Sequence, residues 1–445
     1  MTLKGKMRSI LLTALFDPRF ARATRWLREK RRQLTGRRHV VSVFLQIDDP
    51  YSYILSHYLP SLRKQYDIDV RLYLSQAEGD EYQPAPGLLA EYAVLDCTRL
   101  AEELGIPFLD KGDLPPTEHR IGLSNAVAAL SGTDAFDEEL RQVLAMFWRG
   151  DGRGAASMSR AADSGGLAGE VIADSQTLQK KLGHYNAAML HYAGEWFWGV
   201  DRLHYLTKRL DELGVANSDT PDPLLASVEQ TMKYSLPVKP PAAAKDLPPL
   251  ELFVSFRSPY SYIALRPIYE IADAFGIALK LRPVLPMVMR GMQVPQPKLM
   301  YIAKDTLREA GRRKVAFGKI ADPVGRGVER CLAAFQYAES ENRARDFLLN
   351  AGKAIWAEAI DVATDEGMRK VTARTGLFWP DVEKAINSDD WREPTEANRE
   401  SMMDSGSWGV PTVRMGNFIV WGQDRDWMLL RHIEELCDTG DGILV

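Results

Sequence analysis

Residues 258–263 read SPYSYI and follow the apolar run 250–256, LELFVSF. Residues 49–54 read DPYSYI and follow a second β-like run at 40–47, VVSVFLQI. The two turns are 209 residues apart (258 − 49). Proline is well placed in the first turn of a helix, because its missing N–H would have no partner there. Each half of the chain is therefore predicted to begin with a strand, a Pro-Tyr-Ser turn and a helix.

The two halves of the chain are related well beyond these turns. The same offset of 209 residues pairs Tyr92 with Tyr301, Asp96 with Asp305, Arg99 with Arg308, and Phe108 with Phe317. Near the ends, WGVDR at 198–202 matches WGQDR at 421–425 at an offset of 223 residues (421 − 198). A register that holds from the turn to Phe108 indicates an internal duplication, with a net insertion in the second half.

Each half also shows the same order of predicted elements. A second β-like run follows the first helix, at 68–74 and at 277–284, and a long, mostly helical middle comes next. In the second half, 410–415 and 417–421 flank Gly416 as a predicted hairpin, and 424–436 is predicted as a closing helix. This is the order of a thioredoxin fold with a helical insertion, whose first two strands are parallel. The predicted fold is α/β, with two tandem thioredoxin-like domains, each carrying an α-helical insertion.

The domain boundaries follow from composition. Five prolines lie in the stretch 236–249, LPVKPPAAAKDLPP, which cannot hold an α-helix or a central strand. The predicted parts are a basic helical N-terminal arm (1–38), a first thioredoxin-like domain (39–235), a Pro-rich linker (236–249) and a second thioredoxin-like domain (250–445).

The overall composition is that of a soluble globular protein, with 45% hydrophobic and 26% charged residues. A net charge of −4 gives no sign of a nucleic-acid partner for the whole chain. Cys97, Cys331 and Cys437 are far apart and form no CxxC pair, so neither a disulfide framework, nor a cysteine-based metal site, is expected. A reducing compartment, and hence a cytoplasmic location, is the expectation.

The N-terminal arm has two interpretations. Its apolar run 10–16 ends at Asp17 and Pro18 without a small-residue cleavage site, so it is a poor signal peptide. The following stretch is strongly basic, with Arg19, Arg22, Arg25, Arg28, Lys30, Arg31, Arg32, Arg37 and Arg38. We expect either a solvated or docked amphipathic helix, or contact with an anionic membrane surface or nucleic acid.

Ser258 is the first residue to which chemistry can be assigned. One interpretation is that it only caps the helix that follows. The other depends on the predicted fold, in which this turn is where a CxxC pair stands in thioredoxin-like proteins. Ser258 and Ser261 occupy those two positions, and the helix N-terminus offers unpaired N–H groups and a positive dipole end. A serine there has no thiol to activate, but its hydroxyl can donate to a bound thiolate.

Two further segments belong to the same predicted site. In GVPT (409–412), Pro411 is either the cis-proline that lies opposite the CxxC turn in thioredoxin-like proteins, or the start of an edge strand. In GQDR (422–425), Asp424 is either an acidic N-cap or a group that holds the ammonium of a γ-glutamyl ligand beside the helix amides.

Together these residues resemble the family of 2-hydroxychromene-2-carboxylate isomerases and kappa-class glutathione transferases, a DsbA-like thioredoxin-fold family. The resemblance runs from Phe253 to Arg425 and rests on segments in a consistent order. They are the turn 258–262, LRP at 281–283, KLMYIAKD at 298–305, IDV at 360–362, GVPT at 409–412 and GQDR at 422–425.

The resemblance implies a glutathione site in the second domain. Ser258 matches the family's catalytic serine, which holds the glutathione thiolate, and Lys298 matches a lysine that contacts the far carboxylate of the peptide. Val410, ahead of Pro411, would hydrogen-bond the cysteinyl backbone, while Gln423 and Asp424 would bind the γ-glutamyl end. In the isomerase, the thiolate adds to a conjugated substrate and is later expelled, which is nucleophilic catalysis with a borrowed nucleophile.

The second half of the chain departs from the family pattern at two places, and the first half departs from it further. Arg257 stands where a small or apolar residue is expected, and the acceptor pocket expected at 286–297 does not map residue by residue. In the first half, Asp49 replaces the serine and would repel a thiolate, and NAAM (186–189) stands in place of the Val-Pro-Thr segment. The first half is therefore expected to be a catalytically degenerate scaffold, giving a monomer with an intrachain pseudo-dimer.

Three functions follow. The first is a glutathione-dependent isomerase or transferase that acts on a small aromatic or electrophilic substrate. The second is a DsbA-like thiol-disulfide oxidoreductase, which the missing CxxC pair disfavours because redox cycling needs a resolving thiol. The third is a non-catalytic binding or scaffold protein, whose basic arm recruits a partner.

Overall fold

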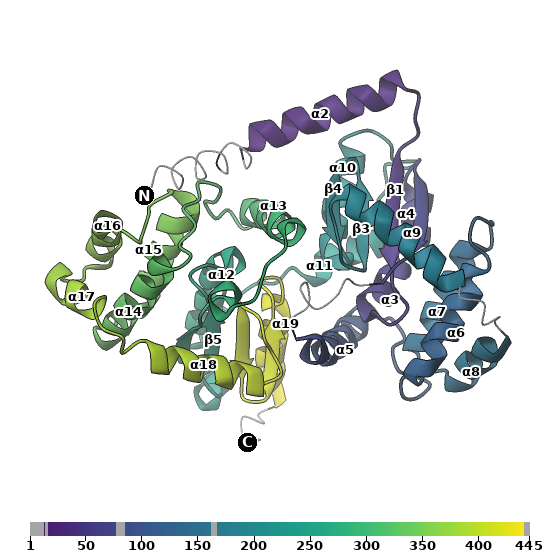
Figure 1. Cartoon of the computed structure of the whole chain (residues 1–445). Coiled ribbons are helices and arrows are strands. Elements are labelled where there is room, and N and C mark those ends of the chain that lie inside the picture. Colours follow the sequence, from purple (N-terminus) through teal and green to yellow (C-terminus); the bar gives the residue numbers. More distant parts are fainter. Residues whose placement is uncertain (1–12, 14–16, 77–84, 162–166, 440–445) are drawn as a thin grey trace. The chain divides into compact units, whose positions relative to one another are not determined.

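The computed structural model describes residue 13 and residues 17–76, 85–161 and 167–439. The chain divides into two compact units, residues 25–233 and residues 234–445, with 1–24 grouped with the second. Most of the first half of the predicted N-terminal arm lies outside the described residues, and its remainder contains helix α2 (Pro18–Leu34) (Figure 1). No helix in the described part of the chain is long and apolar enough to cross a membrane.

Each unit contains one mixed four-stranded sheet, and the two sheets have the same topology. The first has the order β2-β1-β3-β4 and the second β6-β5-β7-β8. In each sheet the first two strands of the chain pair in parallel and the other pairs are antiparallel. The strands are β1 (Val40–Leu45), β2 (Asp69–Leu74), β3 (Met189–Tyr192), β4 (Glu195–Trp198), β5 (Leu250–Val254), β6 (Leu279–Pro283), β7 (Thr412–Met415) and β8 (Phe418–Trp421). The predicted α/β fold with two thioredoxin-like sheets is confirmed.

The central strands are mostly apolar, with only Ser42 in β1 and Glu251 in β5 as polar residues, because both of their faces are covered. In β1 every residue after Val40 is buried, and in β5 only Glu251 is not fully buried. Such continuous apolar runs are typical of strands at the centre of an α/β sheet, whereas one-sided strands alternate. This explains why 40–47 and 250–256 could be recognised as strands from the sequence.

Among the described residues of the first unit, two helices separate β1 from β2, and five lie between β2 and β3. The helices are α3 (Pro50–Ser56), α4 (Leu59–Gln65), α5 (Pro86–Leu104), α6 (Thr117–Ala128), α7 (Phe136–Trp148), α8 (Gly152–Ala161), α9 (Leu167–Leu182), the 3-10 turn η1 (Val200–Arg202), α10 (Leu203–Asp211) and α11 (Pro223–Thr231).

In the second unit, one long helix joins β5 to β6, and most of the insertion between β6 and β7 is helical, apart from irregular stretches such as 315–323 (Figure 1, green). The elements are η2 (Ala242–Asp246), α12 (Pro259–Phe275), η3 (Met287–Arg290), α13 (Gln296–Arg312), α14 (Arg326–Ser340), α15 (Ala344–Ala357), α16 (Asp365–Thr375), α17 (Trp379–Ala385), α18 (Arg392–Asp404) and α19 (Asp426–Thr439). The acceptor region expected at 286–297 thus holds η3 and the start of α13.

The Pro-rich stretch 236–249 is built into the second unit. It forms neither an α-helix nor a strand, but it includes the 3-10 helix η2, which packs against α19. Ala244 and Leu247 are buried there, at 2% and 9% exposure. The boundary between the compact units therefore lies just before this stretch, at Lys233 and Tyr234.

The two sheets also agree residue by residue where the hairpin meets the central strand. Phe44 of β1 pairs with Met189, and Phe253 of β5 pairs with Thr412. The Gly199 amide donates to the Ala188 carbonyl at 2.7 Å, and the Gly422 amide donates to the Pro411 carbonyl at 2.9 Å. Ala188 therefore occupies, in the first unit, the place that Pro411 has in the second.

Candidate functional site

Ser258 stands at the N-terminus of α12, directly after β5. Its backbone is extended, Pro259 occupies the first turn of the helix, and its hydroxyl oxygen accepts from the Ser261 amide at 3.1 Å. The same hydroxyl donates to the carbonyl oxygen of Val410 at 3.4 Å. The N-cap interpretation is thus correct, and the cap also faces the loop that precedes β7. The Ser258 hydroxyl therefore contacts both the N-terminal end of α12, where the helix dipole is positive, and the 409–412 loop that the sequence predicts to lie opposite.

The loop opposite Ser258 is held in a defined conformation. The Val410–Pro411 peptide bond is cis. The Thr412 hydroxyl donates to the Gly409 carbonyl at 2.7 Å and is 2.7 Å from the Ser407 hydroxyl. A Cβ at Gly409 would lie 2.3 Å from the Trp421 ring, so only glycine lets the backbone pass this close to the indole. The sequence singled out 409–412 without showing why it begins with glycine.

Lys298 lies in the first turn of α13, beside the same loop. Its ammonium is 5.6 Å from the ring centroid of Trp408, which is itself 5.5 Å from the Trp421 ring in a T-shaped arrangement. Burial lowers the pKa of Lys298 to about 8. A desolvated ammonium is stabilised by an anionic group placed against it, so this environment suits a carboxylate ligand.

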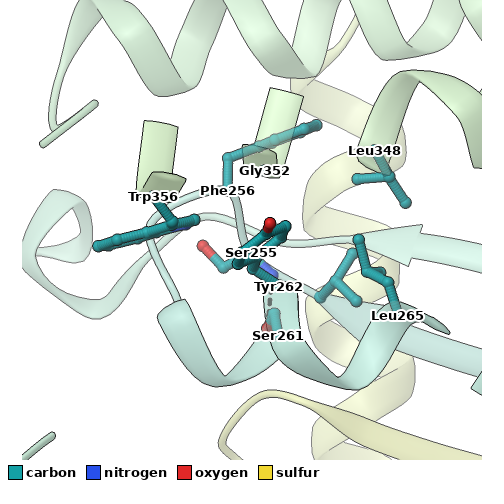
Figure 2. Close-up of a pocket in the computed structure, with 9 residues that line it drawn as sticks. Ser255, Phe256, Ser261, Tyr262, Leu265, Leu348, Gly352 and Trp356 are labelled. Atoms are coloured by element: carbon teal, nitrogen blue, oxygen red, sulfur yellow. Dashed lines mark hydrogen bonds between the residues drawn. The ribbon is translucent and has the colours of Figure 1, made fainter. Parts of the chain in front are cut away.

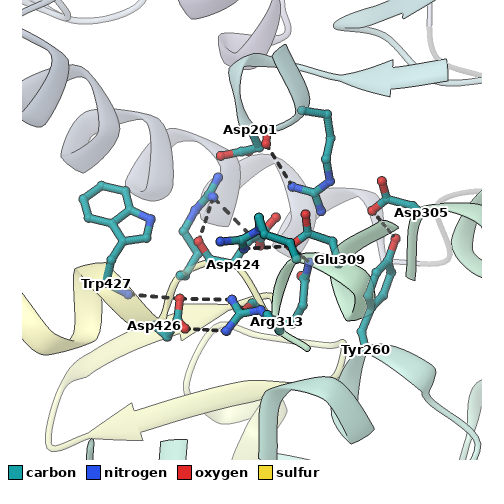
Figure 3. Close-up of polar contacts among 12 residues, drawn as sticks. Asp201, Tyr260, Asp305, Glu309, Arg313, Asp424, Asp426 and Trp427 are labelled. Carbon is teal, nitrogen blue, oxygen red and sulfur yellow. Dashed lines mark hydrogen bonds and ion pairs between the residues drawn. The ribbon is translucent and has the colours of Figure 1, made fainter. Parts of the chain in front are cut away.

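Helix α13 connects the Ser258 turn to the 422–426 segment through one face (Figure 3). The Tyr260 hydroxyl donates to Asp305 Oδ2 at 2.8 Å. One turn further on, Glu309, which has no exposed surface, accepts from the Gln423 side-chain amide at 3.1 Å. Another turn on, Arg313 forms an ion pair with Asp426 at 2.7 Å. Residues four apart lie on the same face of a helix, so one face of α13 contacts both the Ser258 turn and the 422–426 segment.

Glu309 and Arg313 were not identified from the sequence. Their signal in the sequence is a spacing of four and eight residues from Asp305, which the internal repeat pairs with Asp96. In the structure, Arg313 also donates to the Gln423 carbonyl, and the Asp426 carboxylate accepts from the Trp427 amide at 3.2 Å (Figure 3). These contacts position the start of α19.

Gln423 and Asp424 are both buried, at 4% and 7% exposure. The Gly422 amide bonds to the Pro411 carbonyl, so the structure brings this segment next to the cis-proline loop. The Gln423 side-chain amide is directed at Glu309 rather than held free for a ligand. Asp424 lies before α19, whose first residue is Asp426, so Asp424 is not in the helix itself.

A small pocket lies on the other side of the turn, between α12, α15 and the end of β5 (Figure 2). It is lined mostly by apolar side chains, among them Tyr262, Leu265, Leu348 and Trp356. The Ser255 hydroxyl is buried there with no hydrogen-bond partner in the described residues. Ser261, at the start of α12, also lines this pocket.

Arg257, which departs from the family pattern, has a structural partner. It forms a two-contact ion pair with Asp322, at 2.8 and 3.1 Å, and both side chains are 15% exposed. The planar guanidinium matches a carboxylate in this geometry. The pair ties the residue before Ser258 to the loop ahead of α14.

The first unit repeats this geometry with different chemistry. Asp49 takes the place of Ser258 and accepts from the Ser52 amide at 2.9 Å and from the Ser52 hydroxyl at 2.6 Å. Burial raises the pKa of Asp49 to about 6, while the hydrogen bonds from Ser52 act in the opposite direction. A carboxylate at this position repels a thiolate, and Ala188 stands where the second unit has Pro411.

No cluster of His, Cys, Asp and Glu in the described residues could hold a metal ion. None of the three cysteines, all of which are described, is in a disulfide, and Cys97 and Cys331 are buried. Burial raises the pKa of the Cys331 thiol. Burial and the neighbouring Asp438 and Glu434 also raise the pKa of the partly buried Cys437 thiol, so these environments do not favour a thiolate at Cys331 or Cys437.

Comparison with known proteins places the second unit in a family. Residues 249–434 match the model of the DSBA-like thioredoxin domain. The chain is 22% identical over 193 residues to a 2-hydroxychromene-2-carboxylate isomerase of Pseudomonas putida, which covers 42% of this chain and 95% of that protein. It is 23% identical over 184 residues to the enzyme of the same name from Sphingobium xenophagum, covering 40% of this chain and 93% of that protein.

A solved structure of a 2-hydroxychromene-2-carboxylate isomerase is also similar, with 23% sequence identity and a TM-score of 0.39. It covers 43% of this chain and 96% of that one. The sequence matches each span nearly a whole relative but less than half of this chain. Residues 249–434 therefore form a DSBA-like thioredoxin domain, related to the 2-hydroxychromene-2-carboxylate isomerases.

Proposed function

We propose that the second unit binds glutathione and acts on a small aromatic or electrophilic substrate, as an isomerase of the 2-hydroxychromene-2-carboxylate type or a closely related glutathione transferase. The observation that carries the proposal is the position of the Ser258 hydroxyl, at the N-terminus of α12 and 3.4 Å from the Val410 carbonyl. Positions 258 and 261 are both serine, so the reactive thiol has to come from a ligand. Glutathione supplies such a nucleophilic thiolate when bound.

The residues present fit that ligand at most of its groups. Ser258 can turn its hydroxyl hydrogen from the Val410 carbonyl to a bound thiolate, and the helix dipole favours the negative charge. Val410 offers its backbone beside Pro411 to an extended peptide. Lys298, whose pKa burial lowers to about 8, suits a carboxylate.

The residues expected to bind the γ-glutamyl end of glutathione fit it differently from the expectation. Gln423 donates its side-chain amide to Glu309, so this residue would hold the ligand through its backbone and keep its side chain as a support. Asp424 remains the group for the ammonium. Under this proposal the residues bind and orient the peptide, Ser258 stabilises the thiolate, and the electrophile meets it at the α12 N-terminus.

Calorimetry with glutathione and the full chain tests the proposal. We expect Ser258→Ala to bind glutathione with little loss, but with a bound thiol whose pKa, followed by thiolate absorbance against pH, is raised by about one unit or more. Thr364→Ala is the matched control, because Thr364 caps α16 through the Gly367 amide at 3.1 Å, away from this turn. Both variants lose an N-cap worth about 1 kcal/mol, so only the thiol pKa separates them.

The runner-up function is a non-catalytic binding or scaffold protein. The first unit favours it for that half of the chain, because Asp49 and Ala188 replace both the serine and the proline of the site. No binding at millimolar glutathione would extend that function to the second unit and overturn the proposal. We propose that the first unit acts as a scaffold for the second within one chain.

A further inference from the structure

Helix α2 has two faces of different character. Among its 17 residues are seven cations and one carboxylate, in a chain whose net charge is −4. The helix also carries large hydrophobic side chains that are exposed to solvent: Phe20 at 55%, Trp26 at 60%, Leu27 at 60% and Leu34 at 88%. Single exposed hydrophobic residues need no explanation, whereas four on one short helix do.

One face is docked on the turn between β3 and β4. The Arg25 guanidinium forms an ion pair with Glu195 at 2.7 Å, and Arg28 donates to the Ala193 carbonyl at 2.5 Å. Gly194 lets Arg28 lie this close, because a Cβ there would be 1.7 Å from its guanidinium nitrogen. Glu29 and Arg32 are partly buried on the same side and pair with each other at 2.7 Å. These contacts orient the helix.

The opposite face is apolar and basic. Phe20, Leu27 and Leu34 are seven residues apart and therefore form one stripe, since 3.6 residues complete a turn. At 3.6 residues per turn, the exposed cations Lys30 and Arg31 lie on either side of the stripe, and Trp26 lies beyond Lys30. An apolar stripe with an indole and flanking cations is the pattern of helices that lie in the plane of a membrane interface.

We infer that this outer face of α2 binds the surface of an anionic lipid bilayer, with Phe20, Trp26, Leu27 and Leu34 in the headgroup boundary. Charge complementarity favours this occupant, because cations next to the stripe are attracted to anionic headgroups and the stripe itself is apolar. Nucleic acid would use the cations but leave the stripe in water. The inference does not depend on the glutathione proposal.

Co-sedimentation of the full chain with vesicles tests it. We expect binding to vesicles of phosphatidylcholine mixed with phosphatidylglycerol, and little binding to phosphatidylcholine alone. The double variant Trp26→Ser/Leu27→Ser should bind the mixed vesicles at least about tenfold more weakly, because it removes apolar area that the bilayer would cover. Phe378→Ser, which removes a side chain that is 65% exposed elsewhere, is the matched control and should bind as the unaltered chain does.

A charge variant makes the test independent of the apolar residues. Lys30→Gln/Arg31→Gln should weaken binding to the mixed vesicles by about thirtyfold and reduce its salt dependence. Equal binding of the unaltered chain and Trp26→Ser/Leu27→Ser would overturn the inference. The inference would also be overturned if the unaltered chain bound no vesicles and Trp26→Ser/Leu27→Ser lowered the thermal midpoint. The stripe would then be covered by protein rather than by lipid. Binding of DNA that displaces the vesicles and is unaffected by Trp26→Ser/Leu27→Ser would assign the cations to nucleic acid instead.

Discussion

The Tyr260 hydroxyl donates to the Asp305 carboxylate at 2.8 Å, and the Tyr51 hydroxyl donates to the Asp96 carboxylate at 2.9 Å. Both tyrosines directly follow the proline of the turn, and both aspartates belong to the long helix that comes after the second strand. The contact has therefore been kept in both units, although the residue that caps the helix differs. It ties the turn to the helical insertion in each unit.

Tyr260→Phe tests the strength of this tie in the second unit. Asp305 has no exposed surface and keeps Arg308, 3.0 Å away, as a partner, so the substitution removes one charge-assisted hydrogen bond. We expect the free energy of unfolding to fall by about 1–3 kcal/mol, measured by urea denaturation. Tyr51→Phe should act similarly on the first unit. A loss below about 0.5 kcal/mol in both variants would mean that the contact is dispensable.

Asp49→Asn should make stability depend less on pH. Burial raises the pKa of Asp49 to about 6 in the folded chain, against about 3.9 in the unfolded one. The folded state then binds the proton more tightly, so this carboxyl stabilises the fold below pH 4 and loses that contribution as the pH rises to 6. Asparagine keeps a capping oxygen and does not titrate.

We therefore expect Asp49→Asn to be more stable than the unaltered chain by about 2 kcal/mol at pH 7.5, with the difference shrinking towards pH 4. Thermal midpoints of both proteins across this range measure it. A difference that stays constant with pH would show that the Asp49 carboxyl is not desolvated in the fold.

Gly352→Ala should disturb the contact between α15 and α12. A Cβ at this position would lie 2.4 Å from the Tyr262 ring, which lines the pocket behind the turn. The ring is packed and its hydroxyl donates to the Ala316 carbonyl at 3.1 Å, so it cannot move without losing that bond. We expect a loss of about 1–3 kcal/mol in the free energy of unfolding. Gly311→Ala, where a Cβ meets nothing within 4 Å, is the control and should not lose stability.

Ligand binding should weaken above pH 8 if Lys298 holds a carboxylate. Burial lowers the pKa of Lys298 to about 8, so the ammonium is present below this pH and is lost above it. S-methylglutathione separates this effect from titration of the thiol, because its sulfur carries no proton. Its affinity is expected to fall between pH 7.5 and 9.5 in the unaltered chain.

Lys298→Met is the control for this prediction. It should bind S-methylglutathione about tenfold or more weakly at pH 7, since a hydrogen bond to a charged group contributes about 1.5–3 kcal/mol. Its affinity should also lack the additional fall above pH 8. If the affinity of both proteins depended on pH in the same way, Lys298 would not be the residue that binds the carboxylate.

Much of the fold could be predicted from the sequence because its signals are local. The apolar runs at 40–47 and 250–256, the Pro-Tyr-Ser turns and the constant offset of 209 residues (260 − 51) determine the order of strands and helices, whichever way they pack. Each predicted strand ends two residues beyond the observed one (47 − 45 for β1 and 256 − 254 for β5), because the last residues of each run belong to the turn. The Pro-rich stretch was recognised as irregular, but its packing on α19 was not.

The candidate site depends on contacts between residues that are far apart in the chain. The sequence alone determined that Ser258 stands where a helix begins and that Pro411 stands at the start of a predicted hairpin, since both follow from local backbone chemistry. Only the tertiary structure decided that Ser258 faces Val410, that the side chain of Gln423 turns to Glu309, and that Arg257 pairs with Asp322. The physical reason is that a buried polar group must find a partner where packing places one, and the spacing of residues along the chain does not reveal that place.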